Sequence, residues 1–423
     1  MLVMATKPSI LSPSTRPAGK APERAAELDQ SDPLRPFQAR FVEGDPELVY
    51  LDGNSLGRLP KATAERLARV VNVEWGAELV RAWDHWIDDA LRVGDMIGAE
   101  LIGATPGEVV VSDSTTVNLY KLADAALAAQ AGRRFIVAAP DEFPTDRYVL
   151  EGLARRHGME LRWLASDAVA GATVSDVARS LDSEVALVVL SLVNYRSSAF
   201  ADMSGVTAAA HDVGALILWD LSHAVGALPI DLEASGADLA VGCTYKYLNA
   251  GPGAPAFLYV RQALQRVLRN PIQGWFGQRD QFAMGPRYEP EDGIRAWLAG
   301  TPGILAVAAV EEGVRLTADA GITNIRQKSI ALTQFGVELF DERLAPFGFS
   351  LGSPRDPERR GSHVSIRHPR ARELTAQLIA RGVITDFREP DSIRFGMPPL
   401  TTSFSDVARG ILALEELSGP FLP

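Results

Sequence analysis

Short runs of apolar residues, many of them β-branched, alternate with helix-like stretches through the middle of the chain. The runs lie at residues 109–111, 135–137, 185–193, 216–219, 239–241 and 257–260, and turn-forming residues bound each run. Nearly continuous apolar strands are typical of a parallel sheet that helices cover on both faces. The alternation of strands and helices therefore predicts a doubly wound α/β domain.

The pattern changes after about Thr301. Helical periods occupy residues 304–316, 325–344, 371–381 and 405–417, and short strand patterns lie at 364–367 and 392–395. These elements predict a smaller α+β domain. We expect a flexible arm at residues 1–40, a large domain at 41–310 whose N-terminal segment also contributes to the small domain, and the small domain at 311–423.

Composition and charge exclude several classes of function. The 423 residues include 42 Lys and Arg against 53 Asp and Glu, a formal net charge of −11 at pH 7. This balance argues against nucleic acid as the main partner, because phosphate contacts need a basic surface. No apolar run is long enough to predict a membrane span, and the first 40 residues lack the pattern of a secretory signal. Since the only cysteine, Cys243, cannot form an internal disulfide, we expect a cytoplasmic protein.

Polar motifs begin where three of the predicted strands end, and ligands of open α/β sheets bind beyond the carboxyl ends of the strands. The first motif, at residues 113–118, reads Asp-Ser-Thr-Thr-Val-Asn and opens a helical stretch. Free backbone amides and hydroxyls at a helix N-terminus suit a phosphate group. A hydroxyl N-cap without any ligand is the alternative interpretation.

The second motif follows the apolar run at 216–219 and contains Asp220 and His223. The Asp220 carboxylate is expected to be partly desolvated, so it needs a cationic partner. A structural carboxylate bonded to backbone amides is the alternative. The spacing of Asp220 and His223 is also compatible with a metal pair, but no further His or Cys lies nearby in the sequence, and we expect no metal.

The third motif places Lys246 between Tyr245 and Tyr247, directly after the run at 239–241. Only six of the 42 basic residues are Lys, so a surface cation at this position would more often be Arg. Lysine, unlike arginine, can lose its proton when it is desolvated and attack a carbonyl carbon to form a Schiff base. A lysine whose stem lies along apolar surface while its amine reaches water is the alternative.

Together, the three motifs supply an imine-forming lysine, an acid able to pair with a pyridinium nitrogen, and a helix N-terminus for phosphate. Pyridoxal phosphate (PLP) needs these protein groups, and we expect it as the cofactor. Residues 251–256, Gly-Pro-Gly-Ala-Pro-Ala, superficially resemble a dinucleotide fingerprint. We reject that interpretation because the segment precedes a strand and its prolines remove amides. We interpret Cys243 as a small buried residue rather than a nucleophile.

Five segments of the chain resemble motifs of the kynureninase family. They lie in the family's order at residues 50–57, 143–146, 220–223, 245–249 and 274–277, and the likeness runs from about Tyr50 to Phe404. This family consists of PLP-dependent enzymes of fold type I, the aspartate aminotransferase fold, which are usually homodimers. The resemblance implies that fold, with a large, mainly parallel sheet domain and a smaller α+β C-terminal domain, and it implies a homodimer.

The resemblance also implies roles for individual residues. Lys246 would carry the cofactor, Asp220 would pair with its pyridine nitrogen, and Tyr245 is the first candidate to supply a proton to the reacting carbon. Further cofactor contacts would come from Thr115, Thr116, Phe143, Asp146, His223, Tyr245, Trp275 and Thr301. Substrate contacts would come from Arg394, as a fork for the α-carboxylate, and from Asn54 and Trp83. A salt bridge within the small domain is the alternative for Arg394.

Kynureninases hydrolyse the bond between the β and γ carbons of L-kynurenine or 3-hydroxykynurenine, which gives anthranilate or 3-hydroxyanthranilate and L-alanine in tryptophan catabolism. The resemblance implies this activity here. Another PLP enzyme of the same fold, such as a desulfurase, a lyase or an aminotransferase, is an alternative, and so is a non-catalytic binding protein that retains the fold. Two departures from the family pattern, Gln278 in place of the frequent His and Ser198 in place of the usual Gly, concern substrate preference rather than cofactor binding.

Overall fold

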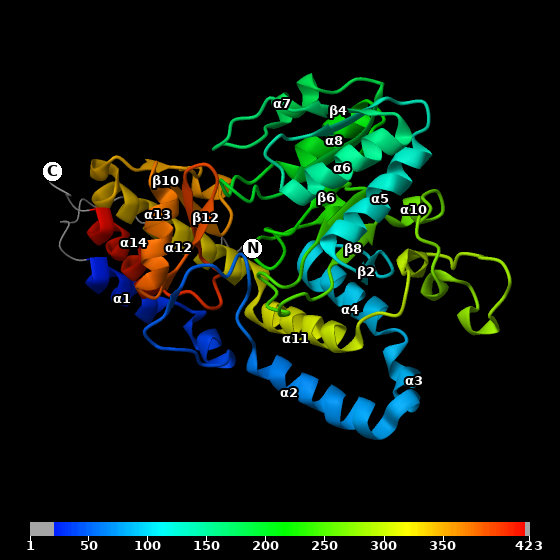
Figure 1. Cartoon of the computed structure of the whole chain (residues 1–423), viewed down its shortest axis with the longest axis horizontal. Coiled ribbons are helices and arrows are strands. Elements are labelled where there is room, and N and C mark those ends of the chain that lie inside the picture. Colours follow the sequence, from blue (N-terminus) through cyan, green and yellow to red (C-terminus); the bar gives the residue numbers. More distant parts are fainter. Residues whose placement is uncertain (1–20, 419–423) are drawn as a thin grey trace, which may run out of the picture.

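The computed structural model describes residues 21–418 and shows two layered units that lie side by side (Figure 1). Within these residues, the main sheet of the larger unit has seven strands in the order β2-β8-β7-β6-β5-β3-β4. They are β2 (Val109–Val111), β3 (Phe135–Ala138), β4 (Glu160–Trp163), β5 (Val185–Ser191), β6 (Leu216–Asp220), β7 (Leu239–Gly242) and β8 (Phe257–Val260). All six apolar runs are therefore confirmed as strands. The sequence pattern missed β4 because this edge strand pairs with β3 alone and carries exposed Glu160 and Trp163.

Strand direction decides which loops meet. Strands β3 to β7 are parallel, and β8 is antiparallel both to β7 and to β2. Because two reversals restore the direction, β2 runs the same way as the parallel strands. The carboxyl ends of β2, β6 and β7 consequently lie at one edge of the sheet, where residues 112–116, 220–223 and 243–247 come together.

Helices cover both faces of this sheet, as the alternating side chains of the strands require. Trp219 belongs to the apolar cluster formed with α4, α8 and α11, whereas Leu218 belongs to the cluster formed with α5 and α6. The helical segments of this unit are α2 (Lys61–Arg69), η2 (Val70–Glu78), η3 (Leu79–Ala82), α3 (Trp83–Trp86), α4 (Asp89–Ile97), η4 (Gly98–Ile102), α5 (Thr115–Ala129), α6 (Pro144–His157), α7 (Val174–Arg179), α8 (Met203–Asp212), α9 (Leu232–Ser235), α10 (Gln262–Gln265), η5 (Trp275–Gly277), η6 (Gln281–Ala283), η7 (Ile294–Trp297) and α11 (Ile304–Ala320).

The smaller unit has its own apolar cluster, built on an antiparallel sheet of order β12-β13-β10-β9. Its remaining elements include a short parallel pair, in which β1 lies beside β11. The bounds are α1 (Ala21–Ser31), η1 (Arg35–Arg40), β1 (Val49–Tyr50), α12 (Ile322–Arg343), η8 (Ala345–Phe347), β9 (Ser350–Leu351), η9 (Pro357–Arg359), β10 (His363–Arg367), α13 (Ala371–Ala380), β11 (Val383–Ile384), β12 (Asp386–Arg388), β13 (Ser392–Gly396) and α14 (Phe404–Ser418). The expected boundary between residues 310 and 311 falls inside α11, whereas α11 and α12 meet at Gly321, where φ is +76°.

The expectation of a flexible arm is wrong for residues 21–40. Ala21 and Ala25 of α1 are buried in the apolar cluster of the smaller unit. Asp29 accepts hydrogen bonds from the amides of Phe404 and Ser405, so it satisfies the otherwise free N–H groups at the start of α14. The physical reason is that the small alanines let α1 pack closely on α14. Residues 1–20 of the expected arm lie outside the described residues.

Candidate functional site

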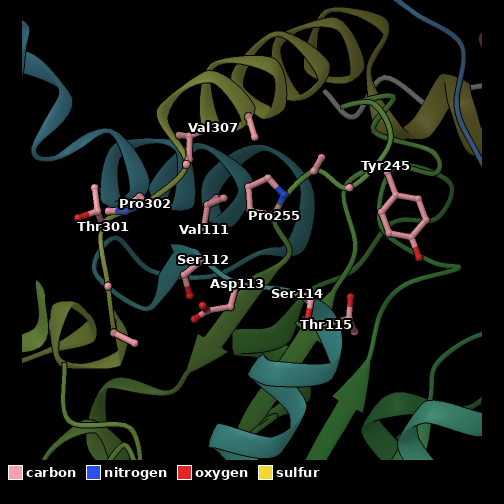
Figure 2. Close-up of a pocket in the computed structure, with 16 residues that line it drawn as sticks. Val111, Ser112, Asp113, Ser114, Thr115, Tyr245, Pro255, Thr301, Pro302 and Val307 are labelled. Atoms are coloured by element: carbon pink, nitrogen blue, oxygen red, sulfur yellow. The ribbon is translucent and has the colours of Figure 1, made fainter.

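A pocket of about 450 Å³ opens at the sheet edge where β2 ends. Its lining comes from residues 111–115, 253–255 and 299–303 together with Tyr245, Ala306 and Val307. Figure 2 shows Thr301 and Pro302 on one side of this pocket and Tyr245 on the other, with Asp113, Ser114 and Thr115 near the start of α5. The structure thus brings the first and third sequence motifs to one cavity.

The start of α5 faces this pocket. Ser114 is the N-cap, and its hydroxyl accepts a hydrogen bond from the amide of Val117 at 3.3 Å. The hydroxyl N-cap, the alternative interpretation of this motif, is therefore present, but it satisfies only one of the first amides of the helix. Thr115 lines the pocket and Thr116 lies exposed next to it. The remaining amides and the threonine hydroxyls can hold an anion.

Lys246 lies just beyond β7 and is 8% exposed. Its Nζ lies 3.3 Å and 3.5 Å from the two ring nitrogens of His223, and 5.9 Å from the centre of the Phe143 ring. Burial, followed by the positive charges of Lys246 and Arg394, lowers the pKa of His223 well below its usual value, so the imidazole is neutral. Within residues 21–418, no carboxylate forms an ion pair with the Lys246 amine, which is held near His223 without a counter-ion.

Two buried carboxylates lie near this amine. Asp220 ends β6 and is 6% exposed, and Asp146 of α6 is 1% exposed. Asp220 Oδ1 accepts a hydrogen bond from the Ser222 amide at 2.8 Å, while Asp146 Oδ2 has no hydrogen-bond partner among the described residues. Burial and the negative charge of Asp220 raise the pKa of Asp146 well above its usual value. Within the described residues, no Lys or Arg side chain therefore forms an ion pair with Asp220 or Asp146.

The sequence predicted only some of the aromatic and acidic side chains that lie near Asp146 and Asp220. Phe143 precedes α6, where Pro144 occupies the first helical position, and its ring is 37% exposed. Tyr195, which the sequence did not indicate, packs edge-on against Phe143 with 5.3 Å between ring centres. Glu142 was also missed: its Oε1 accepts a hydrogen bond from the Ser191 amide at 3.0 Å, and burial raises its pKa to about 8. Its only signal in the sequence was its place next to Phe143 at the start of a helix.

Arg394 of β13 reaches the same region from the smaller unit and is 1% exposed. Its Nε and Nη2 lie 2.9 Å and 2.5 Å from the carboxylate oxygens of Asp386, so the salt bridge within the small domain, the alternative role of Arg394, is present. Its Nη1 donates to the Tyr195 carbonyl at 2.7 Å and lies 3.4 Å from His223 Nε2. The guanidinium therefore links the two units, and one of its edges lies next to the imidazole that contacts Lys246.

Asn54 and neighbouring residues also bind the Arg394 guanidinium. Asn54 is fully buried, and its amide oxygen, turned to satisfy its surroundings, accepts from Arg394 Nε at 2.9 Å and Nη2 at 3.1 Å. Ser55 Oγ accepts from Arg394 Nη2 at 3.0 Å. Gly57 needs to be glycine because a Cβ there would lie 2.3 Å from the Lys246 carbonyl oxygen. The motif at residues 50–57 thus packs against both Arg394 and the Lys246 segment.

Of three further predicted residues, only Thr301 lines the pocket. Trp275 is 43% exposed, packs on Phe276 and does not line it. Trp83 packs against Trp86 and Phe276, with 5.7 Å and 6.0 Å between ring centres, and it does not line the pocket either. Gly274 lets the Trp275 segment approach the chain before Thr301, since a Cβ there would lie 2.0 Å from the Ala299 carbonyl oxygen.

Other candidate chemistry finds little support in the described residues. Cys243 is 2% exposed, and burial raises the pKa of its thiol, which disfavours the reactive thiolate. Residues 21–418 contain no group of three or more His, Cys, Asp or Glu side chains placed to hold a metal ion. The same residues form no helix that is long and apolar enough to cross a membrane. Gln278, one of the two departures, accepts a hydrogen bond from the Glu289 amide at 2.8 Å.

Comparisons with known proteins show the family and the fold of the chain. Residues 325–414 match the model of the kynureninase C-terminal domain. The chain is 44% identical over 400 residues to the kynureninase of Pseudomonas fluorescens, which covers 92% of this chain and 94% of that protein. A cysteine desulfurase from Thermococcus onnurineus has a TM-score of 0.77 at 19% identity, covering 93% of this chain and 97% of that chain. A variant of C-DES, with glycine covalently linked to its PLP cofactor, has a TM-score of 0.77 at 17% identity, covering 88% and 97%.

The two kinds of similarity carry different weight. The solved structures share less than a fifth of their residues with this chain, so they establish the fold alone, the fold-type-I architecture that the resemblance implied. The curated relative is similar over nearly the whole length of both proteins. On that extent of identity, the chain belongs to the kynureninase family.

Proposed function

We propose that this chain is a PLP-dependent kynureninase. It hydrolyses the Cβ–Cγ bond of L-kynurenine, 3-hydroxykynurenine or both, which gives anthranilate or 3-hydroxyanthranilate and L-alanine. The observation that carries the proposal is the convergence of Lys246, His223 and Arg394 next to the buried pair Asp146 and Asp220, in a chain of this family.

The described residues fit PLP. The Lys246 amine has no carboxylate partner within residues 21–418 and is free to bind the cofactor's aldehyde carbon. A protonated pyridine nitrogen supplies the cation that Asp220 and Asp146 lack, and the exposed face of Phe143 suits an aromatic ring. The start of α5, with Thr115 and Thr116, and the facing Thr301 and Tyr245 suit the phosphate. We assign His223 to the ring environment and leave Trp275 as a further predicted contact.

Bound PLP acts as an electron sink for the amino acid that is joined to it. The chain's own residues then move protons and hold the substrate. Lys246 Nζ takes the proton from the α carbon and returns a proton to the amino acid after cleavage, with the neutral His223 beside it. Water adds to the ketone at the γ carbon, so that this carbon leaves as the carboxyl group of anthranilate and the bonding electrons pass to the β carbon. Burial raises the pKa of Tyr245, so its phenol stays protonated and can donate to the β carbon. Arg394 binds the α-carboxylate with the support of Asn54, and we assign Trp83 to the aromatic end of the substrate.

We also propose a homodimer in a reducing cytoplasm. Exposed apolar side chains gather on η2 and η3, which lie at the lower edge of the molecule in Figure 1. They are Val71, Val73, Trp75, Leu79 and Val80, between 41% and 78% exposed. A second copy of the chain would cover such a surface. A buried, unpaired Cys243 is compatible with the cytoplasm.

Two measurements test the activity. Purified protein with PLP is expected to release anthranilate, followed by its fluorescence, from L-kynurenine. Lys246→Ala is expected to lose this activity and the yellow colour of the bound cofactor, and borohydride no longer fixes the cofactor to the chain. The control is Lys61→Ala, because Lys61 is half exposed and pairs only loosely with Glu43 at 3.8 Å. Turnover of cysteine sulfinate without any release of anthranilate would instead favour the desulfurase alternative.

A further inference from the structure

Lys121 is a buried cation to which the proposed reaction gives no role. It lies in the second turn of α5 and its side chain is fully buried. Its ammonium makes three contacts: Asp113 Oδ2 at 2.8 Å, the Trp297 carbonyl at 2.8 Å and Ser112 Oγ at 3.2 Å. An ammonium has three donors and no acceptor, so these three acceptors satisfy it completely.

The three acceptors belong to two segments of the chain that each contribute to the lining of the pocket or lead into it. Ser112 and Asp113 line it on the side of α5. Trp297 ends η7, and the chain that follows it carries Ala299, Gly300 and Thr301, which also line the pocket. The Lys121 ammonium therefore fixes the distance between the start of α5 and the Thr301 segment.

Lys121 also neutralises a negative charge, that of Asp113, which would otherwise repel an anion in the pocket. Asp113 lines the pocket with a carboxylate that is 30% exposed, and it adopts a left-handed φ of +50°. A bare carboxylate at this position would repel a phosphate group. The Nζ atom of Lys121 lies 2.8 Å from Oδ2 of that carboxylate and neutralises its charge. Burial lowers the pKa of Lys121, and the charge of Asp113 counteracts this shift.

We propose that Lys121 is a positioning residue for the phosphate of the cofactor: it joins these two segments of the chain and neutralises Asp113, so that the pocket accepts a phosphate dianion. This inference rests on the proposed placement of the phosphate at the start of α5. It predicts an effect on the phosphate end of the cofactor that is separate from the chemistry at Lys246.

The test compares PLP with pyridoxal, which has the same ring and aldehyde but no phosphate. Apoprotein is titrated with each and the dissociation constant is read from the absorbance or fluorescence of the bound ring. Lys121→Met is expected to raise the Kd for PLP about tenfold or more, equivalent to at least ~1.4 kcal/mol. It should leave the Kd for pyridoxal unchanged. Equal weakening for both probes, or no weakening for PLP, would overturn the proposal.

A matched control separates this role from general stability. Lys328 is also a buried lysine, and its Nζ lies 2.7 Å from Asp32 in the smaller unit, with both side chains 3% exposed. Lys328→Met removes a comparable ion pair far from the pocket. It is expected to lower the melting temperature of the apoprotein without changing the Kd for PLP. A similar loss of PLP affinity in this control would mean that any buried ion pair has the same effect, and would refute a specific role for Lys121.

The double variant Lys121→Met with Asp113→Asn tests the charge argument. Because it removes the uncovered carboxylate, it is expected to recover part of the PLP affinity that Lys121→Met loses, and no recovery would contradict neutralisation of Asp113. If Lys121→Met does not fold, Asp113→Asn alone decides: it keeps the Lys121 contacts to Ser112 and Trp297 and should bind PLP at least as tightly as the natural chain. Tenfold weaker binding in Asp113→Asn would overturn the proposal.

Thr115→Ala distinguishes failure of this inference from failure of the proposed phosphate site. It should weaken the binding of PLP but not of pyridoxal, because Thr115 lines the pocket at the start of α5. If Thr115→Ala has no effect on either probe, the phosphate lies elsewhere and both ideas fall. If it acts as expected while Lys121→Met does not, the phosphate site stands and only the role of Lys121 is refuted.

Discussion

Glu142 gives a quantitative prediction, because the protein keeps this carboxyl group protonated where water would ionise it. Burial raises its pKa to about 8 from an ordinary value of 4.5, although hydrogen bonds from Ser191 oppose the shift. A carboxyl group whose pKa is raised in the folded state stabilises the fold below its unfolded pKa, and loses that contribution as the pH rises through the folded pKa. The window is therefore about pH 4.5 to 8, with a slope of about 1.4 kcal/mol per pH unit.

Replacing Glu142 with Gln removes this titration while the local hydrogen bonds can persist. The amide oxygen can accept from the Ser191 N–H, as Oε1 does at 3.0 Å, and the amide nitrogen can donate to the Ser191 hydroxyl, which lies against Oε2. We expect Glu142→Gln to become more stable relative to the natural chain as the pH rises. Between pH 5.5 and 7.5 the difference in the free energy of unfolding should grow by about 2.5 kcal/mol.

Urea denaturation of the apoprotein at pH 5.5, 6.5 and 7.5 measures this difference. Titrating groups whose pKa shifts do not involve Glu142, such as His223 and His363, are present in both proteins, so their contributions cancel in the comparison. The control Glu65→Gln replaces an exposed carboxylate on α2 and should show no pH-dependent difference. A difference for Glu142→Gln that stays flat over this range would mean that Glu142 is ionised in the folded protein, and the reasoning would fail.

Three further predictions concern the substrate, the backbone and the assembly. Arg394→Lys should raise KM for L-kynurenine at least about tenfold with a smaller change in kcat, because a single ammonium cannot form the fork of a guanidinium; an unchanged KM in steady-state assays would remove Arg394 from the substrate site. Gly57→Ala should lower the free energy of unfolding by about 1–3 kcal/mol and weaken PLP binding, because its Cβ would lie 2.3 Å from the Lys246 carbonyl oxygen. The control Gly44→Ala, whose Cβ would meet nothing within 4 Å, should change neither the free energy of unfolding nor PLP binding. Trp75→Glu should shift the mass measured by light scattering from dimer to monomer, and Tyr148→Glu, an equally exposed aromatic on α6, should not.

The core of the candidate site was predictable because strand direction is a strong constraint. Apolar runs identified β2, β6 and β7, and the carboxyl ends of strands that run the same way must lie at one edge of a sheet. Asp220, Lys246 and the threonines of α5 could therefore be placed together from their position after a run. The edge strand β4 could not be predicted from an apolar run, because a strand at an exposed edge does not need to be apolar.

Contacts between the two units could not be predicted in this way, because they depend on how separately folded layers meet rather than on periodicity along the chain. Arg394 shows the difference. Its position in a short strand of the smaller unit was predictable, and Asp386, opposite it on β12, forms the salt bridge within that unit that the sequence left open. Its other partners, Ser55 and Tyr195, are distant in sequence. A fully buried guanidinium must have its donors satisfied on every side, so each of these acceptors is needed before any substrate binds. Binding of a carboxylate at Arg394 must therefore exchange one acceptor for another, which couples substrate binding to the contact between the two units.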